Sequence, residues 1–186
     1  MKRLPILFAL LFGFTGFLSA EEQTTKFRLI GLSTHERDND LQEVMQSVHD
    51  IKLANFDAEN SEVTLNYDTV NLFPGRNPKT PLKEEEITKR LDELIRTASN
   101  GTFSLKPAST VPKDKLTKLD FHIGILDCKA CRYGAYSIVA TLDGVERASV
   151  TPETSVLNAW IDATKTNREA LEAALKKAHV DLVEGK

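Results

Sequence analysis

The chain of 186 residues contains two cysteines, and they lie three positions apart in the segment Cys128-Lys129-Ala130-Cys131. A helix is predicted to begin in this segment, and two thiols at a helix N-terminus can face a single point. The unpaired N–H groups and the helix dipole there favour the thiolate, which binds soft metal ions or attacks disulfides. A structural zinc site would need a second pair of ligands, and the chain has no further cysteine. The spacing therefore predicts a metal-binding or a redox-active pair.

The elements that must position this pair follow from the apolar pattern of the second half of the chain. The predicted order is strand, helix, strand, strand, helix, strand. The strands are predicted at 119–125, 145–150, 156–161 and 180–183. The first helix carries apolar residues at 135, 138, 139 and 142, and Thr166 with Glu169 forms a predicted capping box for the second. The cysteine pair thus lies where the first strand passes into the first helix.

The first half of the chain repeats this plan. Shifting the sequence by 94 residues aligns Phe27 with Phe121 and Asp68 with Asp162, and an insert at 71–80 then reduces the offset to 84. The strands are predicted at 27–30, 51–56, 63–67 and 102–105. One helix has its apolar stripe at 41, 44, 45 and 48, and the other is predicted to begin at Thr80-Pro81 and end at Asn100-Gly101. Two βαββαβ units predict an α+β protein made of two tandem ferredoxin-like sandwiches.

The second half resembles the heavy-metal-associated domain family, which includes copper chaperones, the periplasmic mercury-binding protein and the N-terminal modules of metal-pumping P-type ATPases. The resemblance rests on the Cys-x-x-Cys after the first strand and on Gly144-Val145 after the helix, and it covers residues 117–184. The family's Gly-Met is replaced by Ile125-Leu126. The resemblance implies that Cys128 and Cys131 bind a soft ion, namely copper(I), zinc(II) or mercury(II), and that the partner is a protein that transports or accepts metal.

Two further residues are candidates for assisting the metal. Family members that handle zinc, cadmium or lead often carry an aspartate before the first cysteine, where this chain has Asp127. The alternative is a carboxylate that stabilises the helix N-terminus. Some relatives place a histidine in the loop before the last strand, and His179 lies one position earlier. The alternative for His179 is an exposed residue at a helix C-terminus.

The first half lacks the cysteines. Gly31-Leu32 matches the family's Gly-Met, but Thr34 and Arg37 occupy the two cysteine positions. His35 and Glu36 could bind a metal, although a solvated charged loop is the simpler interpretation. The first half is therefore predicted to be a degenerate domain of the same family, without a metal site.

The N-terminal segment has the pattern of a secretory signal peptide. A basic start is followed by an apolar run and by the small residues Ser19-Ala20, which predicts cleavage after residue 20. The predicted divisions are a signal peptide at 1–20, the first domain at 24–106, a linker at 107–116 and the second domain at 117–186. We expect a periplasmic or secreted protein that does not span the membrane after cleavage, in a compartment that permits disulfides.

Charge and composition exclude other classes. The formal net charge of −3 argues against a nucleic-acid partner, because phosphate binding needs clustered lysine and arginine. No residues match a hydrolytic or group-transfer site, so we do not expect an enzyme. The leading hypothesis is metal transfer or sequestration through the cysteine pair. The alternatives are a thiol-disulfide redox or interaction module whose cysteines form a disulfide and bind no metal, and a two-domain scaffold.

Overall fold

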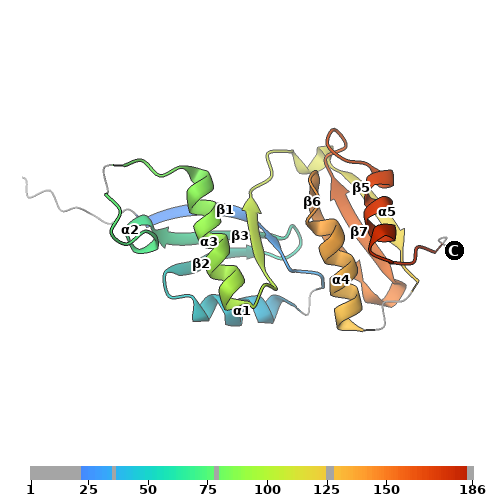
Figure 1. The fold of residues 1–186 in the computed structure, drawn as a ribbon, viewed down its shortest axis with the longest axis horizontal. Coiled ribbons are helices and arrows are strands. Elements are labelled where there is room, and N and C mark those ends of the chain that lie inside the picture. The colour runs from blue at the N-terminus through green and yellow to red at the C-terminus, as the bar shows by residue number, and fades with distance from the viewer. Residues whose placement is uncertain (1–21, 35–36, 78–79, 125–127, 184–186) are drawn as a thin grey trace, which may run out of the picture.

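The structure is a computed structural model that describes residues 22–34, 37–77, 80–124 and 128–183. The predicted signal peptide, His35, Glu36 and Asp127 lie outside the described residues. The described chain forms two α+β lobes side by side, joined by a segment that crosses from one to the other (Figure 1). We refer to them as the first and second domains.

The first domain is a four-stranded antiparallel sheet packed against helices. Its elements are β1 (Glu22–Ile30), α1 (Arg37–Ser47), β2 (Ile51–Asp57), β3 (Glu62–Asp68), the short α2 (Thr69–Leu72), α3 (Glu84–Ala98) and β4 (Ser104–Pro107). The strand order is β2-β3-β1-β4. Alternate residues of β1 enter the core, where Phe27 and Leu29 pack with Leu41 of α1 and Leu91 of α3. The helices and the sheet therefore share one core.

The second domain repeats this arrangement on a smaller scale. Its elements are β5 (Thr117–His122), α4 (Lys129–Ala140), β6 (Val145–Thr151), β7 (Val156–Ile161) and α5 (Arg168–Lys177), with 3-10 turns at Lys113–Lys115 and Pro152–Thr154. The strand order is β5-β7-β6, antiparallel throughout. Leu157 and Ile161 of β7 pack against Val139 of α4 and Leu171 of α5. The predicted fold class, two tandem ferredoxin-like sandwiches, is confirmed.

Three predicted details were wrong. The expected last strand at 180–183 is reduced to an isolated bridge between Ile123 and Leu182, because the N–H of Val180 bonds to the carbonyl of Leu175 at the end of α5 instead of joining the sheet. Helix α3 does not begin at Thr80-Pro81, because the side chain of Glu86 accepts the backbone N–H of Lys83 and fixes the helix start there.

The third detail is the start of α5. The predicted cap Thr166 donates its N–H to the carbonyl of Asp162 and belongs to the preceding turn. Asn167 caps the helix instead, since its side-chain oxygen accepts the N–H of Ala170 at 2.9 Å. The helix therefore begins one residue later than the sequence pattern indicated.

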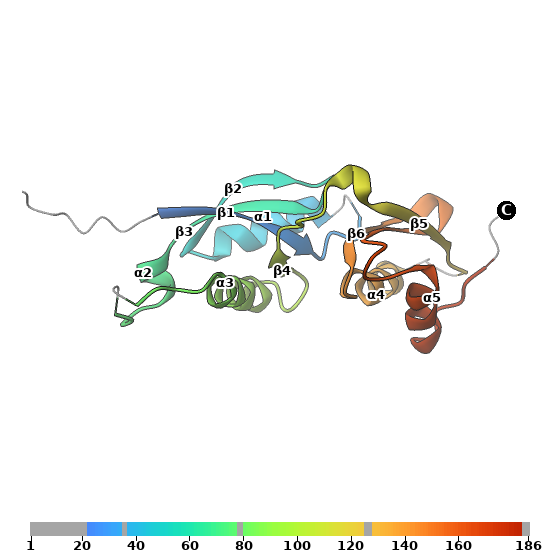
Figure 2. The ribbon, with the colours of Figure 1, turned by 90° about the horizontal axis from the view of Figure 1, so that it is seen from above.

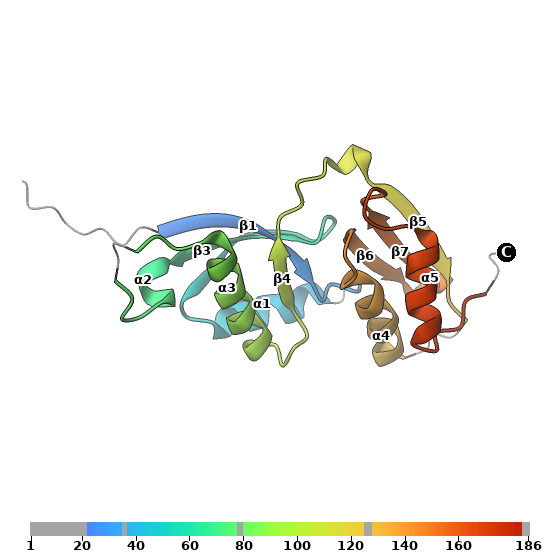
Figure 3. The ribbon, with the colours of Figure 1, turned by 45° about the horizontal axis from the view of Figure 1, so that its top comes forward.

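The two domains are in direct contact. The end of β1 and strand β4 face β6 and α4, and the linker passes along one side of this junction (Figures 2 and 3). Ile30, at the end of β1, packs against the core of the second domain. In the described part of the chain, no helix has the length and apolar character needed to cross a membrane.

Candidate functional site

The cysteine pair forms the N-terminus of α4. Cys128 has extended backbone angles (φ −106°, ψ 148°) and is the N-cap of the helix. Its Sγ accepts the backbone N–H of Cys131 at 3.0 Å, and its carbonyl accepts the N–H of Arg132 at 3.1 Å. A cysteine sulfur thus occupies the capping position that serine or aspartate usually fills. The fold places both sulfurs at the positive end of the helix dipole.

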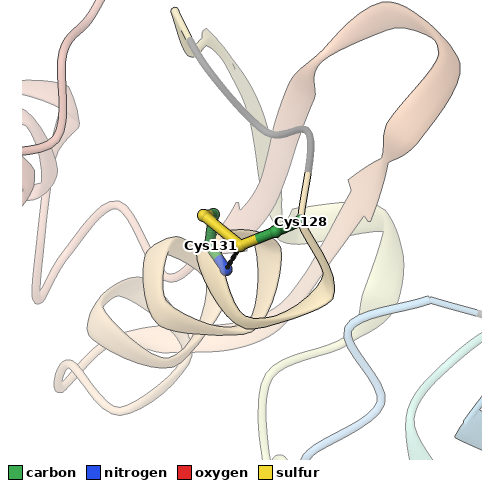
Figure 4. Close-up of a disulfide and its surroundings, with 2 residues drawn as sticks. All are labelled: Cys128 and Cys131. Carbon is green, nitrogen blue, oxygen red and sulfur yellow. Dashed lines mark hydrogen bonds between the residues drawn. A yellow bond between two sulfur atoms is a disulfide. The ribbon is translucent and has the colours of Figure 1, made fainter.

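The two cysteines are joined by a disulfide, with their Cα atoms 5.2 Å apart (Figure 4). Both residues are exposed. The structure thus brings the two predicted site residues together at one point of the surface, in the oxidised form. After reduction, the same geometry would present two thiols side by side to an ion or to another protein.

The surroundings of the pair are polar and draw on both domains. Beside the N-terminus of α4 lies a cavity of about 250 Å³. Its lining residues come from α4 and from the loop and helix that follow β1: Ser33, Thr34, Arg37, Asp40, Lys129 and Arg132. Arg37 forms an ion pair with Asp40, with Nη1 3.4 Å from Oδ2. Thr34 and Arg37, which replace the two cysteines in the first half of the chain, therefore lie beside the first turn of α4, the helix that begins with the cysteine pair.

No further metal ligand gathers at the pair within the residues that the structure describes, where no group of three or more His, Cys, Asp or Glu side chains could hold an ion. His179 is exposed and adopts a left-handed conformation (φ 59°). Its N–H bonds to the carbonyl of Lys176, and that of Val180 bonds to Leu175, which is the Schellman arrangement of a helix end. His179 thus ends α5, as in the alternative interpretation. The assisting role of Asp127 stays a prediction.

In the first domain, the loop that follows β1 corresponds to the cysteine-bearing segment, and it is buried. Gly31, Leu32 and Ser33 are all buried, and the carbonyl of Ser33 accepts the N–H of Val150 on β6 at 2.8 Å. The loop that the repeat aligns with the cysteine-bearing segment is thus in contact with the edge of the second domain's sheet.

Sequence reasoning missed the residues that join the domains. The hydroxyls of Tyr133 and Tyr136, both on α4, form hydrogen bonds with the first domain. Burial raises the pKa of the Tyr136 hydroxyl well above its ordinary value. The available signal was two tyrosines at i, i+3 spacing in the predicted helix, beside its predicted apolar stripe, because a tyrosine hydroxyl that becomes buried needs a partner.

An ion pair between the two domains was also not predicted from the sequence. Arg28 of β1 and Glu146 of β6 form an ion pair at 2.8 Å, and their side chains are 16% and 7% exposed. The same guanidinium donates to the carbonyl of Val145 at 2.8 Å. Arg28 and Glu146 are 118 residues apart, so no local sequence pattern relates them.

Comparison with known proteins gives a limited result. No family model matches the chain, and no curated protein matches it. Among solved structures, oxidised MerP from Ralstonia metallidurans CH34 is 22% identical, covering 37% of this chain and 94% of its own, with a TM-score of 0.35.

The water-soluble region of the P-type ATPase CopA from Bacillus subtilis is 15% identical, covering 90% of this chain and 99% of its own, with a TM-score of 0.34. A solution structure of the N-terminal soluble domains of the same protein gives 15% identity, 88% and 93% coverage, and a TM-score of 0.34. These scores are low, so the topology described above, rather than these likenesses, carries the assignment of the fold.

Proposed function

We propose that the protein binds a soft metal ion through the reduced thiols of Cys128 and Cys131 and acts in metal transfer or sequestration. The observation that carries the proposal is the placement of both sulfurs, exposed and in contact, at the N-terminus of α4. The helix dipole lowers the free energy of the two thiolates there, and thiolates are the preferred ligands of soft ions. The resemblance of residues 117–184 to heavy-metal-associated domains supports the same conclusion.

Copper(I) is the ion that best suits the described donor set. Two thiolates satisfy copper(I) in a near-linear geometry, and mercury(II) accepts the same pair. Zinc(II) normally takes four ligands, so it would need donors beyond the two sulfurs. Asp127 is the sequence's candidate for one of these. In transfer, thiolates of an accepting protein would replace Cys128 and Cys131 one at a time, through a three-coordinate intermediate.

The test is a metal titration of the reduced full-length chain under anaerobic conditions. We expect one copper(I) per chain for the wild type and none for the Cys128→Ser/Cys131→Ser variant. Unchanged stoichiometry in that variant would show that the ion binds elsewhere. A Ser149→Ala variant, altered on β6 away from the pair, is the matched control and should bind as the wild type does.

One observation favours a second candidate function. The pair is closed as a disulfide, and the expected compartment is oxidising. The protein would then be a thiol-disulfide redox or interaction module. Thiol counting on protein purified without reductant distinguishes the two functions, and a reduction potential below about −300 mV would indicate a structural disulfide. The periplasmic or secreted location is a proposal of its own, supported by the signal-peptide pattern of residues 1–20, and it is compatible with both functions.

A further inference from the structure

Two tyrosine hydroxyls attach the cysteine-bearing helix to the first domain. The hydroxyl of Tyr136 accepts the backbone N–H of Gly31 at 2.9 Å, and that of Tyr133 donates to the carbonyl of Thr102 at 3.0 Å. Gly31 and Thr102 are neighbours, since a Cβ atom on Gly31 would overlap the Thr102 oxygen. One helix face thus meets an adjacent donor and acceptor of the first domain's backbone, and its two tyrosines follow Cys131 by only two and five residues.

These contacts are buried or covered. Tyr136 is 1% exposed, and its ring belongs to the core of the second domain. Its side chain therefore packs in one domain while its hydroxyl bonds to the other. The ring of Tyr133 lies under the guanidinium of Arg37, whose Cζ is 5.3 Å from the ring centroid. Because the N–H of Gly31 is buried, loss of the Tyr136 hydroxyl would leave it without this partner.

Docking continues along the edge strand β6, which packs against α4. Arg28 binds the carbonyl of Val145 and the carboxylate of Glu146, and Ser33 accepts the N–H of Val150. The first domain therefore satisfies backbone groups on the free edge of the second domain's sheet. The docking surface thus includes two neighbouring elements of the second domain, α4 and β6.

We propose that Tyr133 and Tyr136 are positioning residues for the cysteine pair: docking onto the first domain fixes α4 and so holds the two sulfurs of Cys128 and Cys131 together. The first domain, without the cysteines itself, acts as the support of the second domain's site. The part of this inference that concerns metal affinity rests on the proposed function, whereas the part that concerns the disulfide does not.

The physical reason is effective concentration. A helix of 12 residues such as α4 depends on packing for its order, and its first turn is the part that frays. A disulfide and a bridging metal ion both require the two sulfurs to lie close together. A helix that is already ordered loses less entropy when they do so. Undocking should therefore make the disulfide easier to reduce and metal binding weaker.

The experiment compares four forms of the full-length chain: wild type, Tyr133→Phe/Tyr136→Phe, Arg28→Met and Tyr67→Phe. Arg28→Met weakens docking without altering α4. Tyr67→Phe is the matched control, because it removes a hydroxyl that bonds to Thr25 at 2.8 Å inside the first domain. The chain contains three tyrosines, so these variants cover all of them.

Each form is equilibrated in buffers of reduced and oxidised dithiothreitol, and free thiols are counted after acid quenching. In the reaction the S–S bond of the protein gains two electrons and two protons from the two thiols of dithiothreitol, which closes to its cyclic disulfide. We expect the two docking variants to shift the equilibrium toward the dithiol threefold to tenfold, a rise of about 15 to 30 mV in midpoint potential. Tyr67→Phe should leave it unchanged.

The fluorescence of Trp160, the chain's single tryptophan, reports docking in the same samples. Arg147 stacks on its ring at 3.4 Å and donates to the carbonyl of Glu59 in the first domain. The inference is overturned if the docking variants change the emission but leave the midpoint potential of the disulfide unshifted. It is also overturned if Tyr67→Phe shifts the midpoint as much as they do. Unchanged emission in both docking variants also overturns it, because these contacts then do not hold the domains together.

Copper(I) competition with a chromophoric chelator gives the second readout, with an expected threefold to tenfold weaker affinity in the docking variants. If the wild type binds no copper(I) but its midpoint shifts as expected, the proposed metal function fails and the positioning role stands. If the wild type binds copper(I) and no variant changes either quantity, the positioning role fails and the metal function stands.

Discussion

The segments that follow the first strand of each domain occupy the same place in the same fold, but one is exposed and the other is buried. In the second domain the chain there enters α4 through Cys128 and Cys131, which are exposed. In the first domain Gly31 and Ser33 are buried against the second domain. The comparison shows that this position in a βαββαβ unit can either expose a cysteine pair or form a docking surface. The side chains decide between the two.

The largest effect is expected from Gly31→Ala, which tests whether the first loop depends on its close packing. Gly31 has φ +123°, and an added Cβ would overlap Phe103 and the carbonyl of Thr102. We expect a loss of about 3 kcal/mol in the free energy of unfolding, measured by urea denaturation. The control is Gly134→Ala in α4, where a Cβ meets nothing within 4 Å and should stabilise the helix by up to about 1 kcal/mol. Equal effects of the two substitutions on stability would contradict the view that the loop at Gly31 depends on close packing.

The next effect concerns the charged pair that holds the two domains together beside these loops. Arg28→Met should cost about 2 kcal/mol of stability, because it leaves Glu146 largely buried without its guanidinium partner. Adding Glu146→Gln should recover part of this loss, since the uncompensated charge is then gone. A double-mutant cycle measured by denaturation gives the coupling. A coupling of zero would mean that the pair contributes nothing to docking.

Reduction of the disulfide should have a smaller effect on stability than either substitution. The bond closes a loop between residues only three positions apart, so it restricts the unfolded chain little, and we expect a loss below about 2 kcal/mol. Denaturation with and without a phosphine reductant measures it. A loss larger than that of Gly31→Ala would mean that the disulfide at the start of α4 contributes more to stability than the close packing around Gly31 does.

The smallest effect concerns the pair of aspartates that the repeat aligns, Asp68 and Asp162. Asp68 caps α2. Asp162 instead accepts hydrogen bonds from the hydroxyl and from the N–H of Thr164. Both bonds lower the pKa of the Asp162 carboxyl, and the hydroxyl has the larger effect. A lowered pKa in the folded state adds stability above the unfolded value of about 4, and this stability is lost as the pH falls through the folded value.

Asp162→Asn should therefore make the loss of stability below pH of about 4 shallower than in the wild type. Thermal unfolding at a series of pH values measures the slope. Thr164→Ala should change the slope in the same direction, because it removes the first of the two hydrogen bonds. An unchanged slope in both variants would show that Asp162 does not contribute to the acid sensitivity.

Local patterns in the sequence were sufficient for most of the fold. The alternation around Phe27 and Leu29 and the apolar stripe that includes Leu41 predicted elements that the structure contains. Helix starts were less predictable, because several residues near each start can cap it. Thr166 lost that role to Asn167 since its N–H bonds to Asp162, a contact that depends on how the turn after β7 folds.

The sequence by itself determined the repeated βαββαβ order and the placement of both cysteines at one helix start, because apolar periodicity and a three-residue spacing are local properties. The tertiary structure decided what surrounds that helix start. Tyr136 meets Gly31 across 105 residues, and Arg28 meets the Val145 carbonyl across 117. Such pairs form only when the sheets of the two domains are brought together, and the free energy of that docking depends on surfaces that no single segment encodes.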